Sequence, residues 1–330
     1  MTTSIRPAGP NDIERMADLL LADAEARCRV DPLLWKLDDS PREKILSAVQ
    51  TSIEAGQERW LLAQVGDAIV GLTHAMIVPV PPIYDGKFGA PGLLMEDCFV
   101  SPDAPLSTRS DLLQATEADL VKAGARMVIA SSAAGGDWED EYARSGYEPV
   151  TLYFSKTGLS RGSMFPSVRS ASEGDVADIV AASAVHREIL ERLNPTFWRI
   201  HAEANDRFAG WMTYSLSLPD RDMFVSEADE QVRGYAISQP ATRLHFPRPH
   251  DISAIGVIDD YFHESIRTPE SPSSRWTDGR ALLEAAEVAR QNRGNNTVLV
   301  VCPAAWRSKI SLLEDAGYRK AITWSFKVFE

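Results

Sequence analysis

The chain repeats part of its own sequence at an offset of 163 residues, from Trp35 to Trp198. Asp31-Pro32-Leu33-Leu34-Trp35-Lys36-Leu37 returns as Asn194-Pro195-Thr196-Phe197-Trp198-Arg199-Ile200. Ile5-Arg6-Pro7-Ala8 corresponds to Val168-Arg169-Ser170-Ala171, and Glu96-Asp97-Cys98-Phe99 to Asp259-Asp260-Tyr261-Phe262. A unit of about 160 residues is large enough to bury its own core. The repeat therefore predicts two similar domains rather than a solenoid of many short units.

The order of helical and strand patterns is the same in both halves, which indicates an α/β fold of the α+β type. We expect an N-terminal domain at 1–157, a linker at 158–166 and a C-terminal domain at 167–330, each with a central, mostly antiparallel sheet flanked by helices. The first half has helical patterns at 11–27, 41–55, 111–122 and 137–144, and strand patterns at 59–65, 68–78, 93–100, 127–131 and 147–156.

Composition excludes several classes of protein. A net charge of −13 disfavours broad nucleic-acid binding, which requires clustered Lys and Arg. No apolar run reaches the length of a membrane span, and no apolar leader follows Met1. The three widely spaced cysteines indicate a reducing compartment, and the histidines do not group at metal-ligand spacing. We therefore expect a cytoplasmic protein with no metal and no nucleic-acid or membrane partner.

Four further motifs carry a resemblance to a known family. They are the start Ile5-Arg6-Pro7-Ala8, the strand Met95-Glu96-Asp97-Cys98-Phe99-Val100-Ser101-Pro102, the helix start Gly279-Arg280-Ala281-Leu282-Leu283, and the endings Ser145-Gly146-Tyr147 and Ala316-Gly317-Tyr318. Together they resemble the GNAT superfamily of acyl-CoA-dependent N-acetyltransferases. The whole chain looks like two such domains in tandem.

The resemblance implies acetyl-CoA as co-substrate, with its pyrophosphate on backbone N–H groups at the start of the third helix of a domain. The family's loop there is Gln or Arg, two residues, Gly, any residue, then Gly or Ala. The first half has no glycine in Ser107-Thr108-Arg109-Ser110-Asp111, and the second half keeps only Gly279. The implied cofactor-binding residues are Phe99, Val100, Thr108, Arg109, Ser110, Arg275, Thr277, Gly279 and Arg280.

Glu96 is the candidate base, because an alkylamine is mostly protonated at pH 7 and must lose a proton before it attacks a thioester. On a strand its side chain would lie opposite Asp97 and on the side of Cys98. The alternative is that the two acids are solvated or ion-paired.

Tyr142 matches the family's tyrosine that protonates the leaving thiolate, although an aromatic residue there can also serve packing alone. The second half has Leu313 at that position.

Trp35 and Tyr84 are the candidate acceptor-binding residues, from the repeated Pro-x-x-Trp motif and the Pro-rich loop 79–92. Core packing of Trp35 and simple exposure of the loop are the alternatives. The sequence thus predicts transfer of an acyl group, acetyl by preference, to the amine of a small molecule. A tandem protein of the same fold that binds a ligand or partner without catalysis is the second hypothesis. The acceptor, the acyl chain length and the oligomeric state stay open.

Overall fold

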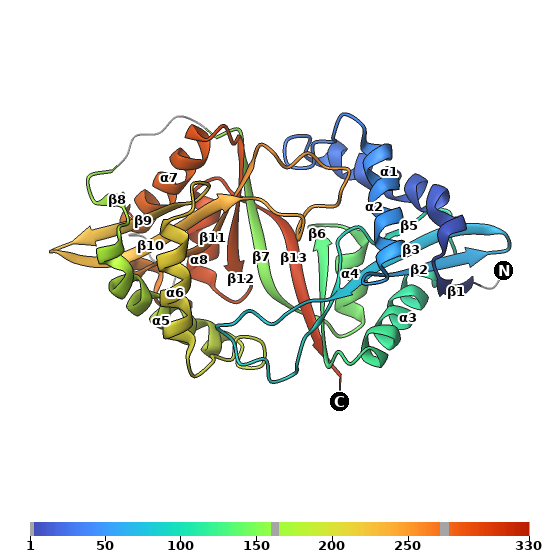
Figure 1. The fold of residues 1–330 in the computed structure, drawn as a ribbon, viewed down its shortest axis with the longest axis horizontal. Coiled ribbons are helices and arrows are strands. Elements are labelled where there is room, and N and C mark those ends of the chain that lie inside the picture. Colours follow the sequence, from blue (N-terminus) through green and yellow to red (C-terminus); the bar gives the residue numbers. More distant parts are fainter. Residues whose placement is uncertain (1–2, 160–164, 271–276, 330) are drawn as a thin grey trace.

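The computed structural model describes residues 3–159, 165–270 and 277–329, and it consists of one long mixed sheet with helices on both faces (Figure 1). The helices of the first half are α1 (Ile13–Val30), α2 (Pro41–Ala55), α3 (Thr108–Lys122) and α4 (Asp137–Arg144). Those of the second half are α5 (Val176–Leu193), α6 (Ala204–Leu216), α7 (Thr277–Asn292) and α8 (Arg307–Asp315). Short 3₁₀ turns η1 (Pro10–Asp12) and η2 (Glu173–Asp175) precede α1 and α5, and η3 (Glu264–Ile266) precedes α7.

The strands follow the same repeated order. In the first half they are β1 (Thr3–Pro7), β2 (Arg59–Val65), β3 (Ala68–Ile77), β4 (Gly92–Leu94), β5 (Phe99–Val100), β6 (Met127–Ala133) and β7 (Glu148–Thr157). In the second half they are β8 (Val168–Ser170), β9 (Asp222–Ala228), β10 (Gln231–Pro240), β11 (Ile255–His263), β12 (Thr297–Pro303) and β13 (Arg319–Val328). The predicted α/β class with a mostly antiparallel sheet in each half is confirmed.

The last strand of each half lies against the sheet of the other half. The sheet order is β1-β2-β3-β4-β6-β13-β7-β12-β11-β10-β9-β8, with β5 attached to β3. Thus β13 pairs with β6 of the first half, β7 pairs with β12 of the second, and β7 and β13 pair at the centre (Figure 1). The repeat predicts two half-sheets, and it contains no sign that they are joined into one.

Side chains that alternate along the strands divide the core of each half into two layers. In the first half, Trp60 and Leu62 pack under α1 and α2, whereas Leu61 and Ala63 pack under α3. The second half repeats this division, with α5 and α6 on one face and α7 and α8 on the other. In each half, one pair of helices therefore covers one face of the sheet and the other pair covers the opposite face.

The repeat in the sequence corresponds to repeated contacts in the structure. Arg6 holds both carboxylate oxygens of Asp12 at 2.7 and 2.8 Å, and Arg169 holds those of Asp175 at 2.8 Å. The guanidinium lowers the pKa of each carboxyl group. Such charge-assisted, two-point pairs fix the entry of the chain into α1 and α5 in the same way.

The segments after α1 and α5 bind the Pro-rich loops of the opposite half. The amide of Asp251 donates to the carbonyl of Lys36 at 2.8 Å, and that of Asp85 donates to the carbonyl of Arg199 at 2.9 Å. The two halves are thus linked by exchanged strands and by exchanged loops. The predicted linker falls between β7 and β8, and the division at 157 and 167 stays a prediction.

One predicted element differs in a way that matters for the site. The strand expected at 93–100 is broken into β4 and β5, with a turn at Glu96–Asp97 between them. In the second half β11 runs without a break, but its pairing with β10 shifts at the matching place: Ile237 pairs with Asp260 and Ser238 with Ile258, so Asp259 is an extra residue on β11. Because Glu96 and Asp97 form a turn, the alternation of side chains along a strand does not determine where these two side chains point.

Candidate functional site

The first half opens between two strands where the candidate base lies. β4 pairs in parallel with β6 from Gly92 to Leu94, whereas β5 pairs only with β3 within the described part of the chain. The strands diverge after Leu94, so the edge of β5 that would face β6 makes no strand pairing there. The turn that carries Glu96 stands at the start of this opening.

Glu96 is enclosed and has no partner among the described residues. Its side chain is 3% exposed, and neither carboxylate oxygen accepts a hydrogen bond. Burial raises the pKa of Glu96 to about 7, with the negative charge of Asp97 adding to the rise and the guanidinium of Arg27 opposing it. A carboxyl group with such a pKa is balanced between its acid and base forms near neutral pH.

Arg27 of α1 is the cation that faces Glu96, and the sequence analysis missed it. Its guanidinium pairs with Asp23 at 2.9 Å and stacks over the ring of Trp35 at 5.2 Å. An arginine four residues after an aspartate on a helix usually forms an ion pair on the surface. The sequence alone therefore does not indicate that Arg27 is buried, which the fold shows.

Asp97 belongs to a second buried network that sequence reasoning also missed. Its carboxylate lies 2.9 Å from Nδ1 of His74, whose Nε2 lies 3.3 Å from Glu58. Burial disfavours the charged imidazole, yet Asp97 and Glu58 outweigh it and raise the pKa of His74 to about 9. The ring stacks on Trp60 at 3.8 Å. The imidazolium balances Asp97, so Glu96 is the acid of the pair without a direct partner in the described structure.

Tyr142 approaches the opening from the other face of the sheet. It lies on α4 in the layer of Cys98 and Tyr147, is 1% exposed, and its hydroxyl has no hydrogen-bond partner in the described residues. Burial raises the pKa of Tyr142 well above its ordinary value, with Cys98 and Tyr147 adding to the rise. The group stays a protonated O–H donor. Glu96 and Tyr142 therefore come to the same opening, although the rings around Tyr142 also give it a packing role.

The start of α3 provides part of what a diphosphate requires. The amides of Thr108 and Asp111 donate to the carbonyls of Pro105 and Ser107, whereas those of Arg109 and Ser110 have no partner among the described groups. Arg109 pairs with the exposed Asp137 at 2.7 Å. Two orphan amides and a nearby guanidinium fit an anion, although the loop lacks the family's glycines.

The corresponding opening of the second half is filled by its own side chains. β11 leaves β12 after Ile258, and Lys309 of α8 crosses the gap to donate to the carbonyl of Tyr261 at 2.7 Å. Lys309 is 1% exposed and lies under the rings of Tyr261 and Trp306. The ammonium thus donates its hydrogen bond to a backbone carbonyl on the edge of β11 that faces the opening.

The predicted cofactor residues of the second half are engaged elsewhere or outside the described structure. The carbonyl of Gly279 accepts from the hydroxyl of Tyr261 at 2.7 Å, and a Cβ at Gly279 would lie 2.7 Å from Oγ of Ser265. Arg280 pairs with Glu284 and donates to the carbonyl of Asp315. Arg275 lies outside the described residues, as does the side chain of Thr277.

The acidic pair of the second half has a different setting. Asp260 lies 3.1 Å from Nδ1 of His186, a residue of α5, and Asp259 is exposed and accepts from Gln239 at 3.1 Å. The partner histidine thus comes from a helix in this half and from β3 in the first half. The side chain of Asp259 is exposed, yet the surrounding protein and the charge of Asp260 raise its pKa to about 6, so Asp259 differs from Glu96 in exposure rather than in the direction of its pKa shift.

The two predicted acceptor residues lie in different places. Trp35 is 3% exposed and packs against Phe246 and His250, whose Nδ1 is 3.0 Å from the carbonyl of Trp35. Tyr84 packs against Trp198 of the opposite half. Each contact joins one half to a loop or motif of the other, and the structure does not bring Trp35 and Tyr84 into one pocket.

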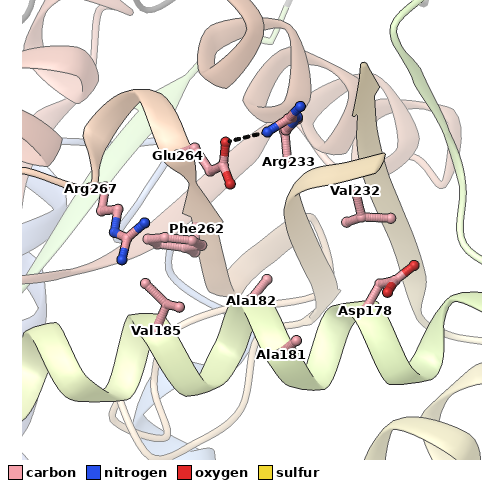
Figure 2. Close-up of a pocket in the computed structure, with 9 residues that line it drawn as sticks. All are labelled: Asp178, Ala181, Ala182, Val185, Val232, Arg233, Phe262, Glu264 and Arg267. Carbon is pink, nitrogen blue, oxygen red and sulfur yellow. Dashed lines mark hydrogen bonds and ion pairs between the residues drawn. The ribbon is translucent and has the colours of Figure 1, made fainter. Parts of the chain in front are cut away.

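Two pockets lie side by side along α5 of the second half. The first, of about 190 Å³, has a floor of Ala181, Ala182, Val185 and Phe262 and a rim that includes the pair Arg233–Glu264 (Figure 2). The second, of about 480 Å³, shares Val185 and Arg267 with it. None of the predicted site residues lines either pocket.

The residues described include no helix long and apolar enough to cross a membrane, and no metal-binding group of three or more acidic, His or Cys side chains.

Comparison with solved structures shows which known fold this chain resembles. No protein-family model matches the sequence, and no curated protein matches it. A GCN5-related N-acetyltransferase from Sphaerobacter thermophilus is similar over 99% of this chain and 95% of its own, with a TM-score of 0.55 and 16% identity. A tandem GNAT protein from the clavulanic acid biosynthesis pathway covers 98% of this chain and 97% of its own, with a TM-score of 0.47 and 11% identity. The likeness to the Sphaerobacter thermophilus protein confirms the GNAT fold that the motifs predicted.

Proposed function

We propose that the protein is an acyl-CoA-dependent N-acyltransferase that acetylates the amine of a small molecule in its first half. The observation that carries the proposal is Glu96, a carboxyl group that is enclosed, unpartnered in the described structure and balanced near neutral pH. It stands after the end of β4, where the chain leaves β6 and β5 pairs with β3 alone within the described residues. Burial of a polar group without a partner is costly, and a substrate amine would satisfy it.

The chemistry assigns one proton to each group. The ionised Glu96 takes a proton from the substrate ammonium, directly or through water, so that the neutral amine can attack the thioester carbonyl. The hydroxyl of Tyr142, with its raised pKa, is the donor for the thiolate that leaves. Arg27 opposes the rise in the pKa of Glu96 and keeps a useful fraction of it ionised at pH 7. Acid and base thus stand on the two faces of one opening.

The acyl donor fits the first half better than the second. The unpaired edge of β5 at Phe99–Val100 would hold the amides of the pantetheine arm, and the free amides of Arg109 and Ser110 would hold the pyrophosphate. In the second half, Lys309 already bonds the edge of β11. We therefore assign binding and catalysis to the first half and a supporting role to the second.

Thermal unfolding with and without acetyl-CoA tests the proposal. A ligand at 100 times its Kd adds about 2.7 kcal/mol to the free energy of unfolding. We expect Glu96→Gln and Tyr142→Phe to keep this stabilisation and to lose turnover, measured as release of the CoA thiol. Absence of any stabilisation by acetyl-CoA or longer acyl-CoAs would favour the alternative, a ligand-binding protein of this fold without catalysis. The enclosed site and the glycine-free loop before α3 are the observations behind that alternative.

A further inference from the structure

The unpartnered polar atoms near Glu96 come from both halves of the chain. Within the described structure, the first half contributes the carboxylate of Glu96 and the hydroxyl of Ser131. The second half contributes the indole nitrogen of Trp324 and Nδ1 of His245, both buried and without a hydrogen-bond partner in that same part of the chain. Native structures pair nearly all buried polar atoms, so such a gathering indicates a missing occupant.

Strand exchange brings Trp324 to the first-half site. In the pairing of β6 with β13, Ser131 lies directly opposite Trp324, and residues opposite each other share a face of the sheet. The hydroxyl of Ser131 is close enough to Glu96 to act on its pKa. Trp324, although it belongs to the last strand of the chain, therefore lies next to Ser131, a neighbour of Glu96.

Three rings form a wall next to these atoms. Tyr153 lies 4.4 Å from His245 and 5.4 Å from Trp324, and His245 lies 5.2 Å from Trp324, all measured between ring centres. Burial raises the pKa of Tyr153 well above its ordinary value, and the charges of Asp259 and Glu96 add to the rise, so both acids act on this ring. Burial lowers the pKa of His245 to about 4, so its ring is neutral at pH 7. The rings are inclined to one another at 44°, 53° and 61°, and the wall that they form is aromatic and uncharged.

We propose that the second half builds the acceptor side of the Glu96 site, with Trp324 and His245 as the residues that determine acceptor specificity. This inference rests on the proposed function. The ammonium of the acceptor pairs with Glu96, and its body lies against the rings. The indole N–H donates a hydrogen bond to an oxygen or nitrogen at the far end. Arg27, the nearby cation, is already paired with Asp23. The acceptor class is therefore a primary amine with an aromatic body and a polar tip, without a carboxylate.

Tyramine and phenethylamine, which differ only in the phenolic oxygen, are the matched probes. With acetyl-CoA, we expect the wild-type KM for tyramine to be about tenfold below that for phenethylamine, the value of one hydrogen bond of about 1.4 kcal/mol. Trp324→Phe keeps the ring and should abolish this preference, and His245→Phe should raise both amine KM values severalfold. The KM for acetyl-CoA should not change. Trp211→Phe, at an exposed position on α6, is the matched control and should retain the preference.

Amine-induced stabilisation without acetyl-CoA separates this inference from the proposed function. Thermal shifts with each amine should favour tyramine in the wild type and in Trp211→Phe, but not in Trp324→Phe. If acetyl-CoA neither binds nor reacts while these amine shifts are present, the proposed function is wrong and the composite wall stands. If the wild type shows no tyramine preference in either assay, or if Trp324→Phe retains it, the composite wall is wrong, whatever acetyl-CoA does.

Discussion

The two halves share a fold and differ in what occupies the opening between their strands. The first half has an enclosed carboxyl group without a partner in the described chain, and a protonated tyrosine on the opposite face. The second half has a lysine bonded to the strand edge and an exposed aspartate in place of the enclosed glutamate. A duplicated fold can therefore retain its architecture in both copies while the side chains at the two openings diverge.

The comparison also explains why the second half is still needed. It gives the first half its neighbouring strand β13, the residues Trp324 and His245 beside the site, and the loop that packs on Trp35. Under the proposed function, the exchange of strands makes the second half part of the active site in the first. The following predictions test this asymmetry, beginning with the largest effect.

Glu96→Gln should reduce turnover by roughly 10²- to 10⁴-fold, because general base catalysis contributes about that factor. The matched substitution in the other half, Asp259→Asn, should leave turnover within about twofold, since that side chain is exposed. Release of the CoA thiol at saturating amine measures both. An equal loss in the two variants would show that the halves share the chemistry.

Glu96→Gln should also stabilise the protein at high pH. The folded-state pKa of Glu96, about 7, lies above its ordinary value of 4.5. The folded state therefore binds this proton more tightly, and stability falls as pH rises from 4.5 to 7. The neutral amide avoids that loss, so the variant should gain about 3 kcal/mol at pH 8 and almost nothing at pH 4. Urea unfolding at the two pH values measures the gain, and an equal gain at both would contradict the assigned pKa.

The sequence predicted the fold well because the fold depends on patterns that repeat. The period of apolar residues, the Asp–Pro turn before Trp35 and the glycine endings of both halves are local, and they survive duplication. The site was predicted only in part. Glu96 and Tyr142 were found through the resemblance, whereas Arg27 and His74 were not. Their roles depend on burial and on a turn where alternation predicted a strand. The contribution of Trp324 depends on strand exchange, which no local pattern specifies.

His74→Gln should remove a different part of the pH dependence. The pKa of His74 is raised from 6.5 to about 9, so its stabilising contribution is complete below pH 6.5 and is lost as pH rises through 9. We expect the wild type to lose up to about 3 kcal/mol across this window and the variant to lose much less. His201→Gln, on the loop before α6, is the control and should behave as the wild type. If the variant keeps the full wild-type loss between pH 6.5 and 9, the imidazolium is not the cause.

Lys309→Met should have the smallest effect of the series on acetyl transfer. Lys309 lies in the half that we do not assign to catalysis, and methionine keeps most of its buried volume. We expect turnover within about twofold of the wild type and one acetyl-CoA bound per chain in both, by isothermal titration calorimetry. The rings of Tyr261 and Trp306, which lie 5.2 and 5.7 Å from the ammonium, remain in the variant, so we expect that loss of the ammonium alone does not create a second site. A second equivalent bound by the wild type would mean that both openings accept acyl-CoA and that the difference between the halves lies only in Glu96 and Tyr142.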